Sequence, residues 1–213
     1  MLIAFEGIDG SGKTTQAELL SRRLANENIP NEILREPGGT PLGEGVRELL
    51  LHRTDLKINP VTEFFLFSAS RAQLVREKII PILESGKVVI LDRYFYSSIA
   101  YQGFGRGIPV QQIEMVSHLA TKALIPDVIF LVELDTKTAL KRRLLARRSA
   151  DRMEDAEVKF FEKVSEGFTY CAKKEPDRFV IVNGNGSVND MADKIFFEVM
   201  RKIKKSAEER DAS

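Results

Sequence analysis

One stretch near the N-terminus constrains this chain more than any other, because it dictates both a backbone turn and a class of ligand. Residues 7–14 read Gly-Ile-Asp-Gly-Ser-Gly-Lys-Thr, which fills every fixed position of the pattern G-x-x-x-x-G-K-S/T. An apolar run at residues 2–5 precedes the pattern, and residues 15–20 after it have helical spacing. The stretch therefore predicts a buried strand, a glycine-rich loop and a helix, in that order.

The predicted loop is a cradle for phosphate groups. Its glycines let backbone N–H groups point inward, where the positive end of the following helix dipole adds to their attraction for an anion. Lys13 supplies a full charge for the β- and γ-phosphates of a nucleotide, and the Thr14 hydroxyl can bind Mg²⁺. The alternative is a glycine-rich turn without a ligand. The predicted ATP-binding residues are Gly7, Ile8, Asp9, Gly10, Ser11, Gly12, Lys13 and Thr14.

Composition narrows the range of functions. Lysine and arginine number 32 against 31 acidic residues, so a net charge of +1 gives no electrostatic reason to expect a nucleic-acid or membrane partner. Neither a signal-peptide pattern nor a run of about twenty apolar residues is found, which predicts a cytoplasmic protein. The single cysteine, Cys171, excludes an internal disulfide and is expected to be a packing residue. His52 and His118 lack metal-ligand spacing.

Apolar runs and helical spacing alternate along the whole chain, with no linker or repeat to divide it. Strands are expected at residues 2–5, 32–35, 88–91, 128–134 and 179–182. Helices are expected at residues 15–28, 42–51, 61–83, 109–124, 136–146 and 188–203. The helix at 61–83 is expected to kink at Pro81, one more helix begins at about residue 96, and another ends at about residue 174. A loop is expected at Gly103, Gly105 and Gly107, and a frayed charged tail at the end. This order predicts one α/β domain, residues 1–213, with the three-layer P-loop NTPase fold: a five-stranded parallel sheet with helices on both faces.

Several polar clusters stand out beside the phosphate loop, some of them at the carboxyl ends of strands, where a parallel sheet places its ligand crevice. They are residues 35–40 (Arg-Glu-Pro-Gly-Gly-Thr), Phe67 with Arg71 at i and i+4 of one helix, residues 92–94 (Asp-Arg-Tyr) followed by Ser97, Ser98, Tyr101 and Gln102, and an arginine-rich segment at 147–152. That last segment has no apolar period, so an exposed loop is expected there.

Taken together, the phosphate loop and these clusters closely resemble the thymidylate kinase family, in the same order and over nearly the whole chain. The guanine-reading N/T-K-x-D sequence of GTPases and the extra early lysine of segregation ATPases do not occur. The resemblance implies transfer of a phosphoryl group from ATP, with Mg²⁺, to dTMP, giving dTDP for dTTP biosynthesis. It also implies a homodimer, and a phenylalanine-rich helix around Phe64 and Phe65 has more apolar surface than one sheet needs.

The resemblance assigns residues to the phosphate and sugar of the acceptor. It puts Arg93 on the dTMP phosphate, with Arg47 as a helper, and a guanidinium suits a phosphate because it binds bidentately. Asp9 resembles the family's acidic residue near the acceptor sugar and phosphate. The alternatives are structural salt bridges for the two arginines and stabilisation of the loop backbone for Asp9.

For the base, the resemblance makes Phe67 a stacking platform and Arg71 a donor to the O4 carbonyl of thymine, an atom that cytosine replaces with an amine. Ser97, Ser98 and Gln102 are the further expected substrate contacts, at the edge of the base. Tyr101 is expected to lie against the sugar, where a ribose 2′-hydroxyl would clash with it. Without the resemblance, Phe67 is a core residue and the two serines are helix caps.

A carboxylate at the end of an apolar strand, Asp92, is expected to hold Mg²⁺ together with Thr14. Its alternative is an ion pair with a neighbouring arginine.

The arginines at 147, 148 and 152 lie where the family has its lid, about residues 147–153. Gly10 in the phosphate loop makes the chain resemble the bacterial members, whose catalytic arginine is in the lid. Arg147, or else Arg152, is then the cation that closes over the migrating phosphoryl group. The alternative is a solvated charged loop.

Two rival interpretations stay open. Another nucleoside-monophosphate kinase would share the scaffold, and the set Phe67, Arg71 and Ser98 discriminates against it. A non-catalytic nucleotide-binding module would keep the loop alone. The complete Lys13/Thr14 pair and the arginine lid argue against such a module. The predicted catalytic residues are Lys13, Asp9, Arg93, Arg147 and Arg152.

Overall fold

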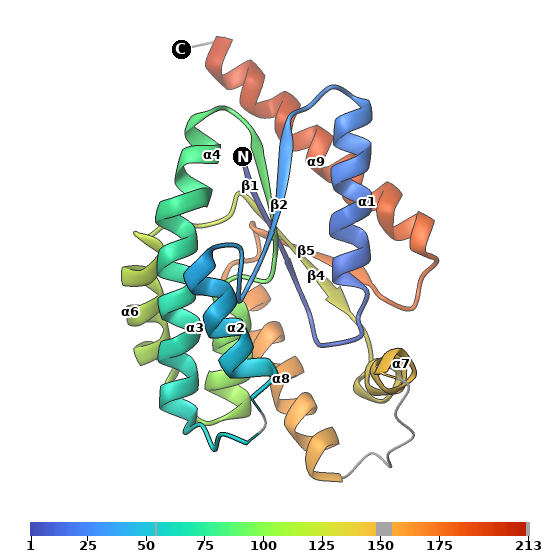
Figure 1. Cartoon of the computed structure of the whole chain (residues 1–213). Coiled ribbons are helices and arrows are strands. Elements are labelled where there is room, and N and C mark those ends of the chain that lie inside the picture. The colour runs from blue at the N-terminus through green and yellow to red at the C-terminus, as the bar shows by residue number, and fades with distance from the viewer. Residues whose placement is uncertain (54, 148–154, 212–213) are drawn as a thin grey trace.

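Five parallel strands form one sheet in the order β2-β3-β1-β4-β5, with helices on both faces (Figure 1). The computed structural model describes residues 1–53, 55–147 and 155–211. The strands are β1 (Leu2–Glu6), β2 (Asn31–Arg35), β3 (Val88–Asp92), β4 (Val128–Glu133) and β5 (Phe179–Asn183). The predicted fold class is confirmed, and each predicted strand is present with bounds that differ by one residue or less at either end.

Helical elements lie between successive strands of the parallel sheet, and one more helix follows the last strand. They are α1 (Lys13–Asn26), α2 (Pro41–Leu51), α3 (Pro60–Leu74), the π-helical turn η1 (Val75–Ile79), α4 (Ile80–Glu84), α5 (Phe95–Ser98), the π-helical turn η2 (Ile99–Gly105), α6 (Val110–Thr121), α7 (Thr136–Arg147), α8 (Asp155–Lys174) and α9 (Val188–Asp211).

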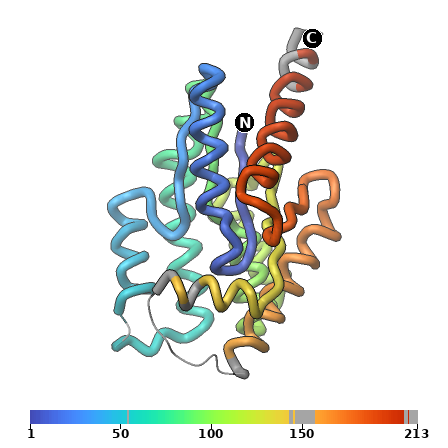
Figure 2. Tube along the Cα trace, turned by 90° about the vertical axis from the view of Figure 1, so that its right-hand side faces the viewer, coloured from blue at the N-terminus to red at the C-terminus, as the bar shows by residue number. Residues whose placement is uncertain are grey.

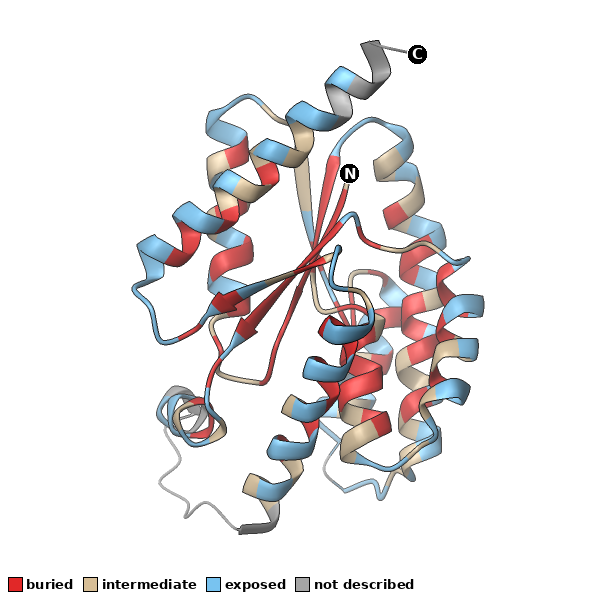
Figure 3. Ribbon diagram, turned by 180° about the vertical axis from the view of Figure 1, so that it is seen from behind, coloured by how far each residue is buried: buried red, intermediate tan, exposed pale blue. Residues whose placement is uncertain are grey.

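The central strand β1 is buried along its whole length, because both of its faces are covered. Ile3 and Phe5 face a cluster that includes side chains of α1 and α9, and those two helices lie together on one face of the sheet (Figure 2). Leu2 and Ala4 face the opposite cluster, which includes side chains of α3, α6 and α8. This alternation explains why β1 has no polar face, and Figure 3 shows the buried strands between their two helical layers.

The predicted helix at 61–83 is divided by a π-helical turn. The structure has α3, then η1, then α4, and Pro81 is in the first turn of α4. A proline lacks the N–H that the preceding α-helical turn needs, and the wider π-helical turn lies directly before it. The predicted distortion is therefore present, but it occupies the turn before Pro81.

The predicted loop at Gly103, Gly105 and Gly107 is wrong for its first two residues, which belong to η2. A Cβ on Gly105 would lie 2.7 Å from the ring of Phe160. A Cβ on Gly167 of α8 would lie 2.7 Å from the Cα of Ala100 in η2. These glycines therefore permit close packing between η2 and α8, and only Gly107 lies outside the helical turn.

The predicted frayed tail is also wrong, since α9 continues to Asp211. Residues 204–211 are mostly lysine, alanine, glutamate and arginine, which are good helix formers even without apolar periodicity. Elsewhere Cys171 is buried as expected. Within the described ranges, no helix is long and apolar enough to cross a membrane.

Candidate active site

The phosphate loop joins β1 to α1 with the backbone geometry that its glycines allow. Gly12 directly precedes α1 with a φ of +97°, and the backbone N–H of Ser11 donates to the carbonyl of Ile8 at 3.2 Å. A Cβ on Gly7 would lie 2.6 Å from the carbonyl oxygen of Val132, so only glycine fits between β1 and β4 there. The loop leads directly into the N-terminus of the 14-residue helix α1, and the positive end of a helix dipole favours an anion.

Lys13 and Thr14 lie at the start of α1 beside the end of β3. The Lys13 side chain is buried, its Nζ is 3.9 Å from Oδ1 of Asp9, and burial together with Arg93 lowers the pKa of its ammonium to about 8. Thr14 Oγ1 donates to Oδ2 of Asp92 at 2.5 Å. In the described structure the other oxygen of Asp92, Oδ1, is buried without a hydrogen-bond partner. A hydroxyl and an under-satisfied carboxylate beside a phosphate loop suit Mg²⁺, which takes one or two protein ligands and completes its shell with phosphate and water.

Arg93 extends from the end of β3 across the phosphate loop. Its backbone φ is +76°, which is a left-handed conformation that arginine seldom adopts. The guanidinium donates to the carbonyl of Gly7 at 3.0 Å, to Tyr101 Oη at 3.2 Å and to Asp9, and it lies 5.0 Å from the Tyr101 ring centroid. Burial lowers the pKa of the guanidinium, but Tyr101 and Asp9 outweigh this effect, so it stays charged.

A cleft of about 390 Å³ opens beside Arg93, between the end of β2, α2, α3, η2 and α8. It brings together residues that the sequence predicted for the acceptor nucleotide, from elements far apart in the chain. Those that line it are Asp9, Arg47, Phe67, Arg93, Ser97, Ser98, Tyr101 and Gln102. Phe67 is half-buried, whereas its neighbour Phe64 belongs to the core, so the ring at 67 is free to face a ligand.

Arg71 is predicted to contact the base, but its guanidinium lies behind the cleft wall. Only 1% of the residue is exposed. Its Nε and the carboxylate of Glu36 are 2.7 Å apart, and its other arm donates to Ser98 Oγ at 3.1 Å. Both partners line the cleft, and burial raises the pKa of Glu36 while Arg71 opposes this rise. Arg71 therefore does not line the cleft itself but contacts Glu36 and Ser98, which do.

Arg47 and Gln102 are held at opposite walls of the cleft. Arg47 donates to the carbonyl of Pro37 at 2.9 Å, which ties α2 to the turn after β2. Gln102 donates through Nε2 to Oε1 of Glu63 at 2.8 Å, and Arg106 contacts the other oxygen of Glu63 at 3.4 Å. Glu63 therefore holds the Gln102 amide and the Arg106 guanidinium, one on each of its oxygens, and all three residues line the cleft.

Several residues of the site were not identified from the sequence. Glu36, Glu63 and Arg106 line the cleft, as do the rings of Phe160 and Phe161 on α8. Glu36 was visible only as part of the Arg-Glu-Pro motif. The others lie on helices whose polar and apolar residues look like ordinary surface and core positions, so no sequence signal separates them.

The lid predictions fall largely outside the described residues. Arg147 is the last residue of α7, but its side chain is not described, and residues 148 and 152 lie outside the described ranges. Nearby, Arg142 of α7 donates to the carbonyl of Gly184 at 3.1 Å, which links α7 to the turn after β5.

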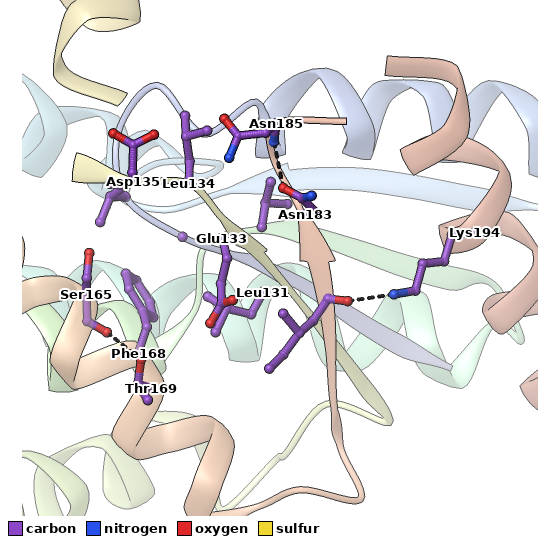
Figure 4. Close-up of a pocket in the computed structure, with 14 residues that line it drawn as sticks. Leu131, Glu133, Leu134, Asp135, Ser165, Phe168, Thr169, Asn183, Asn185 and Lys194 are labelled. Atoms are coloured by element: carbon purple, nitrogen blue, oxygen red, sulfur yellow. Dashed lines mark hydrogen bonds between the residues drawn. The ribbon is translucent and has the colours of Figure 1, made fainter. Parts of the chain in front are cut away.

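A second cavity of about 470 Å³ lies under the carboxyl ends of β4 and β5, and Figure 4 shows its lining. Lys194 donates to the carbonyl of Ile181 at 2.8 Å, and the carboxylates of Glu133 and Asp135 lie apart. Apart from Gly7 and Ile8, none of the residues predicted for a nucleotide lines this cavity. It lacks the convergent cations of the cleft beside Arg93.

The fold and the site together define a P-loop protein in which a glycine-rich loop lies beside an arginine-lined cleft. Comparison with known proteins refines that class. The family model described as thymidylate kinase matches residues 5–195. The chain is 47% identical over 182 residues to the thymidylate kinase of Caldanaerobacter subterraneus subsp. tengcongensis, covering 85% of this chain and 86% of that protein. It is 40% identical over 205 residues to that of Kosmotoga olearia, covering 96% and 98%.

A solved structure agrees with these sequence matches. The crystal structure of thymidylate kinase from Ehrlichia chaffeensis superposes with a TM-score of 0.76 at 34% sequence identity, covering 94% of this chain and 98% of that one. The chain therefore belongs to the thymidylate kinase family.

Proposed function

We propose that this protein transfers the γ-phosphoryl group of ATP to dTMP, giving dTDP and ADP, with Mg²⁺ bound at the phosphate loop. Membership of the thymidylate kinase family supports the substrate pair. One structural observation carries the proposal: the Asp9–Arg93 ion pair joins the phosphate loop to the acceptor cleft. Donor and acceptor phosphates bound on either side of that pair would be held close enough for direct transfer.

On the donor side, Lys13 and the loop amides would hold the β- and γ-phosphates. Lys13 has a pKa of about 8, so its ammonium is charged at neutral pH, and a bound polyphosphate would raise that pKa further. Thr14 and Asp92 would hold Mg²⁺, which supplies charge neutralisation at the transferring oxygens. The lid segment, about residues 147–153, would add Arg147 or Arg152 and exclude water.

On the acceptor side, Arg93 would bind the dTMP phosphate with help from Arg47, and Asp9 would lie between that phosphate and the sugar. The Tyr101 ring lies edge-on to three phenylalanines, including Phe160 and Phe161 at 6.2 Å, and is therefore fixed in place. A ring fixed at this point would clash with a ribose 2′-hydroxyl, and this would favour deoxynucleotides.

The base would stack on Phe67, with its polar edge toward Ser98 and Gln102. Because Arg71 donates to Ser98, that hydroxyl keeps its own proton for an acceptor such as a base carbonyl. Thymine offers the O4 carbonyl, whereas cytosine offers a donor at the same position. This pattern supports dTMP over dCMP.

The decisive assay couples ADP formation to a panel of monophosphates. We expect dTMP to give the highest kcat/KM, with dCMP, AMP and UMP at least about tenfold lower. Equal or better activity with any of those three would point to another nucleoside-monophosphate kinase. ATP binding with no dTMP-dependent ADP would instead point to a non-catalytic nucleotide-binding module.

We also propose that the protein is a single-domain subunit of a cytoplasmic homodimer. Large apolar side chains are exposed on α2, α3 and α6, three helices that pack against one another in series. They include Leu49, Val61, Phe65, Met115 and Leu119, of which Leu119 is 76% exposed. A second copy covering this face would bury them.

Sedimentation tests the dimer. The wild type is expected to sediment as a dimer at micromolar concentration, and Phe65→Glu with Leu119→Glu is expected to shift it to a monomer, because two charges would be buried without partners. A wild-type monomer under those conditions would contradict the dimer while leaving the catalytic proposal intact.

A further inference from the structure

An acidic residue lies at the end of the strand that is buried at every position. Glu6 ends β1, directly before the phosphate loop, and none of its surface is exposed. Burying a carboxylate in this position is costly unless its oxygens are satisfied. Both oxygens of Glu6 accept hydrogen bonds, which offset this cost.

Both oxygens of Glu6 contact the turn that carries Arg93. Oε1 accepts the backbone N–H of Tyr94 at 2.9 Å and that of Ser97 at 3.2 Å, so it caps the N-terminus of α5 from a strand that is remote in sequence. Oε2 accepts the hydroxyl of Ser97 at 2.5 Å. Glu6 therefore joins β1 to the start of α5 through three hydrogen bonds.

These bonds fix the direction of the Ser97 hydroxyl. When Glu6 is ionised, its carboxylate only accepts hydrogen bonds, so the Ser97 proton then points to Glu6. The Ser97 oxygen is then left as an acceptor for Arg93, whose Nη1 lies 2.9 Å away. Arg93 thus donates to Ser97, and Ser97 donates to Glu6. Ser97 can accept from Arg93 in this way because its own proton is taken by Glu6.

Arg93 needs such support, because its backbone is held in the left-handed region at a φ of +76°. A residue in that region costs free energy and persists only where its surroundings determine it. Its guanidinium also has to aim at a phosphate that other groups place. The contacts of Glu6 hold the backbone just after Arg93 and one arm of its side chain at once.

We propose that Glu6 is a positioning residue for phosphoryl transfer, which holds the guanidinium of Arg93 in the acceptor cleft through the hydroxyl of Ser97. The inference rests on the proposed role of Arg93 toward the dTMP phosphate. It gives Ser97 a role in orienting Arg93 in place of a contact with the base edge.

The substitution that tests this is Glu6→Gln, which keeps the shape and reverses one hydrogen bond. The amide oxygen still accepts the two backbone N–H groups, but its NH₂ now points at Ser97 as a donor. The Ser97 oxygen then receives two donors, and the negative charge facing Arg93 is lost. We expect the KM for dTMP to rise about tenfold, while the KM for ATP changes by less than about twofold.

Ser97→Ala is expected to raise the KM for dTMP similarly, and Ser97→Thr to restore it in large part, because threonine keeps the hydroxyl. The double variant Glu6→Gln with Ser97→Ala is expected to be no worse than the worse single variant, since both act along one path. Ser117→Ala is the matched control: this serine is also buried, on α6, and the cleft does not include it.

The dependence of kcat/KM on pH distinguishes the positioning role from a purely structural one. Burial raises the pKa of Glu6 to about 7. Arg93 and Lys13 face this carboxylate and favour its charge, whereas Glu36 opposes it and Cys171 lies nearby. A protonated Glu6 would act on Ser97 as the Gln variant does, so wild-type kcat/KM for dTMP is expected to fall below about pH 7 more steeply than that of Glu6→Gln. Titration of dTMP itself is common to both proteins.

The outcomes separate this inference from the proposed function. If Arg93→Lys leaves the KM for dTMP unchanged, the proposed role of Arg93 fails. If Arg93→Lys raises that KM but Glu6→Gln and Ser97→Ala do not, only the positioning role is overturned. Equal losses for dTMP and ATP with a lowered Tm in both variants would make Glu6 a purely structural residue.

Discussion

The two sides of the proposed active site are built in different ways. The donor side is one continuous segment, Gly7 to Thr14, completed by Asp92 from the adjacent strand. The acceptor side draws on the end of β2, on α2, α3, η2 and α8, and on Arg93 at the end of β3. A local motif makes the first, whereas the second exists only where those elements pack. Removal of the Lys13 side chain should therefore leave acceptor binding nearly intact, whereas removal of a buried acceptor-side residue such as Arg71 should affect stability and recognition together.

The largest effect is expected from Lys13→Ala. Removing this charge should lower kcat on the order of 10³-fold, because electrostatic stabilisation of the transferring group supplies most of the catalysis. Binding of dTMP alone, measured by calorimetry, should change by less than about twofold. An equal loss of dTMP affinity would show that the two sides are not separate.

Arg71→Ala is expected to damage the acceptor side and the fold together. The substitution leaves the buried carboxylate of Glu36 without its partner, which should lower the free energy of unfolding by about 3–5 kcal/mol. Urea unfolding measures this loss. In the folded fraction, the KM for dTMP should rise while ATP binding stays nearly unchanged.

The double variant Arg71→Met with Glu36→Gln sharpens this prediction. Replacing both charged partners should recover most of the stability but not the use of dTMP. Recovery of both would mean that the pair serves the fold alone, and loss of neither in Arg71→Ala would contradict the base-recognition role.

The buried carboxylate at the junction of the two sides predicts an unusual pH dependence of stability. The native pKa of Glu6 is about 7 against an unfolded value near 4.5, so between these values the native state binds more protons than the unfolded one. The contribution of Glu6 to the free energy of unfolding should then fall as pH rises through this window, by roughly 3 kcal/mol in total. Urea unfolding at several pH values measures this. The free energy of unfolding of Glu6→Gln, minus that of the wild type, should increase from pH 4.5 to pH 7. A constant difference would contradict the raised pKa.

The smallest effect is expected from Phe67→Ala. Loss of a stacking surface should raise the KM for dTMP about tenfold, with little change for ATP and a small change in Tm, because Phe67 is only half-buried. Phe197→Ala on α9, where the ring is 67% exposed and distant from the cleft, is the control. A large fall in Tm for Phe67→Ala would make it a core residue after all.

Much of the fold could be predicted because parallel strands buried on both faces produce continuous apolar runs, as in β1, β3 and β4. The errors have specific causes. Gly103 and Gly105 carry the sequence signature of a loop, but a Cβ on Gly103 would lie against Ile113 of α6 and a Cβ on Gly105 against Phe160 of α8. The two glycines therefore serve close packing of η2 against separate helices, which the sequence does not reveal. The extension of α9 was missed because helix-forming residues without apolar periodicity also resemble a tail.

Taken alone, the sequence determined the strand, loop and helix on which the proposed donor site lies, since the eight residues of the loop pattern are contiguous and their spacing dictates that order. It also determined the layered α/β sheet. Only the tertiary structure decided that Arg71 lies behind Glu36 and Ser98, that Glu63 accepts the Gln102 amide, and that Glu6 contacts Arg93 through Ser97. Such contacts depend on the distances between side chains of separate elements, and those distances are set when the elements pack.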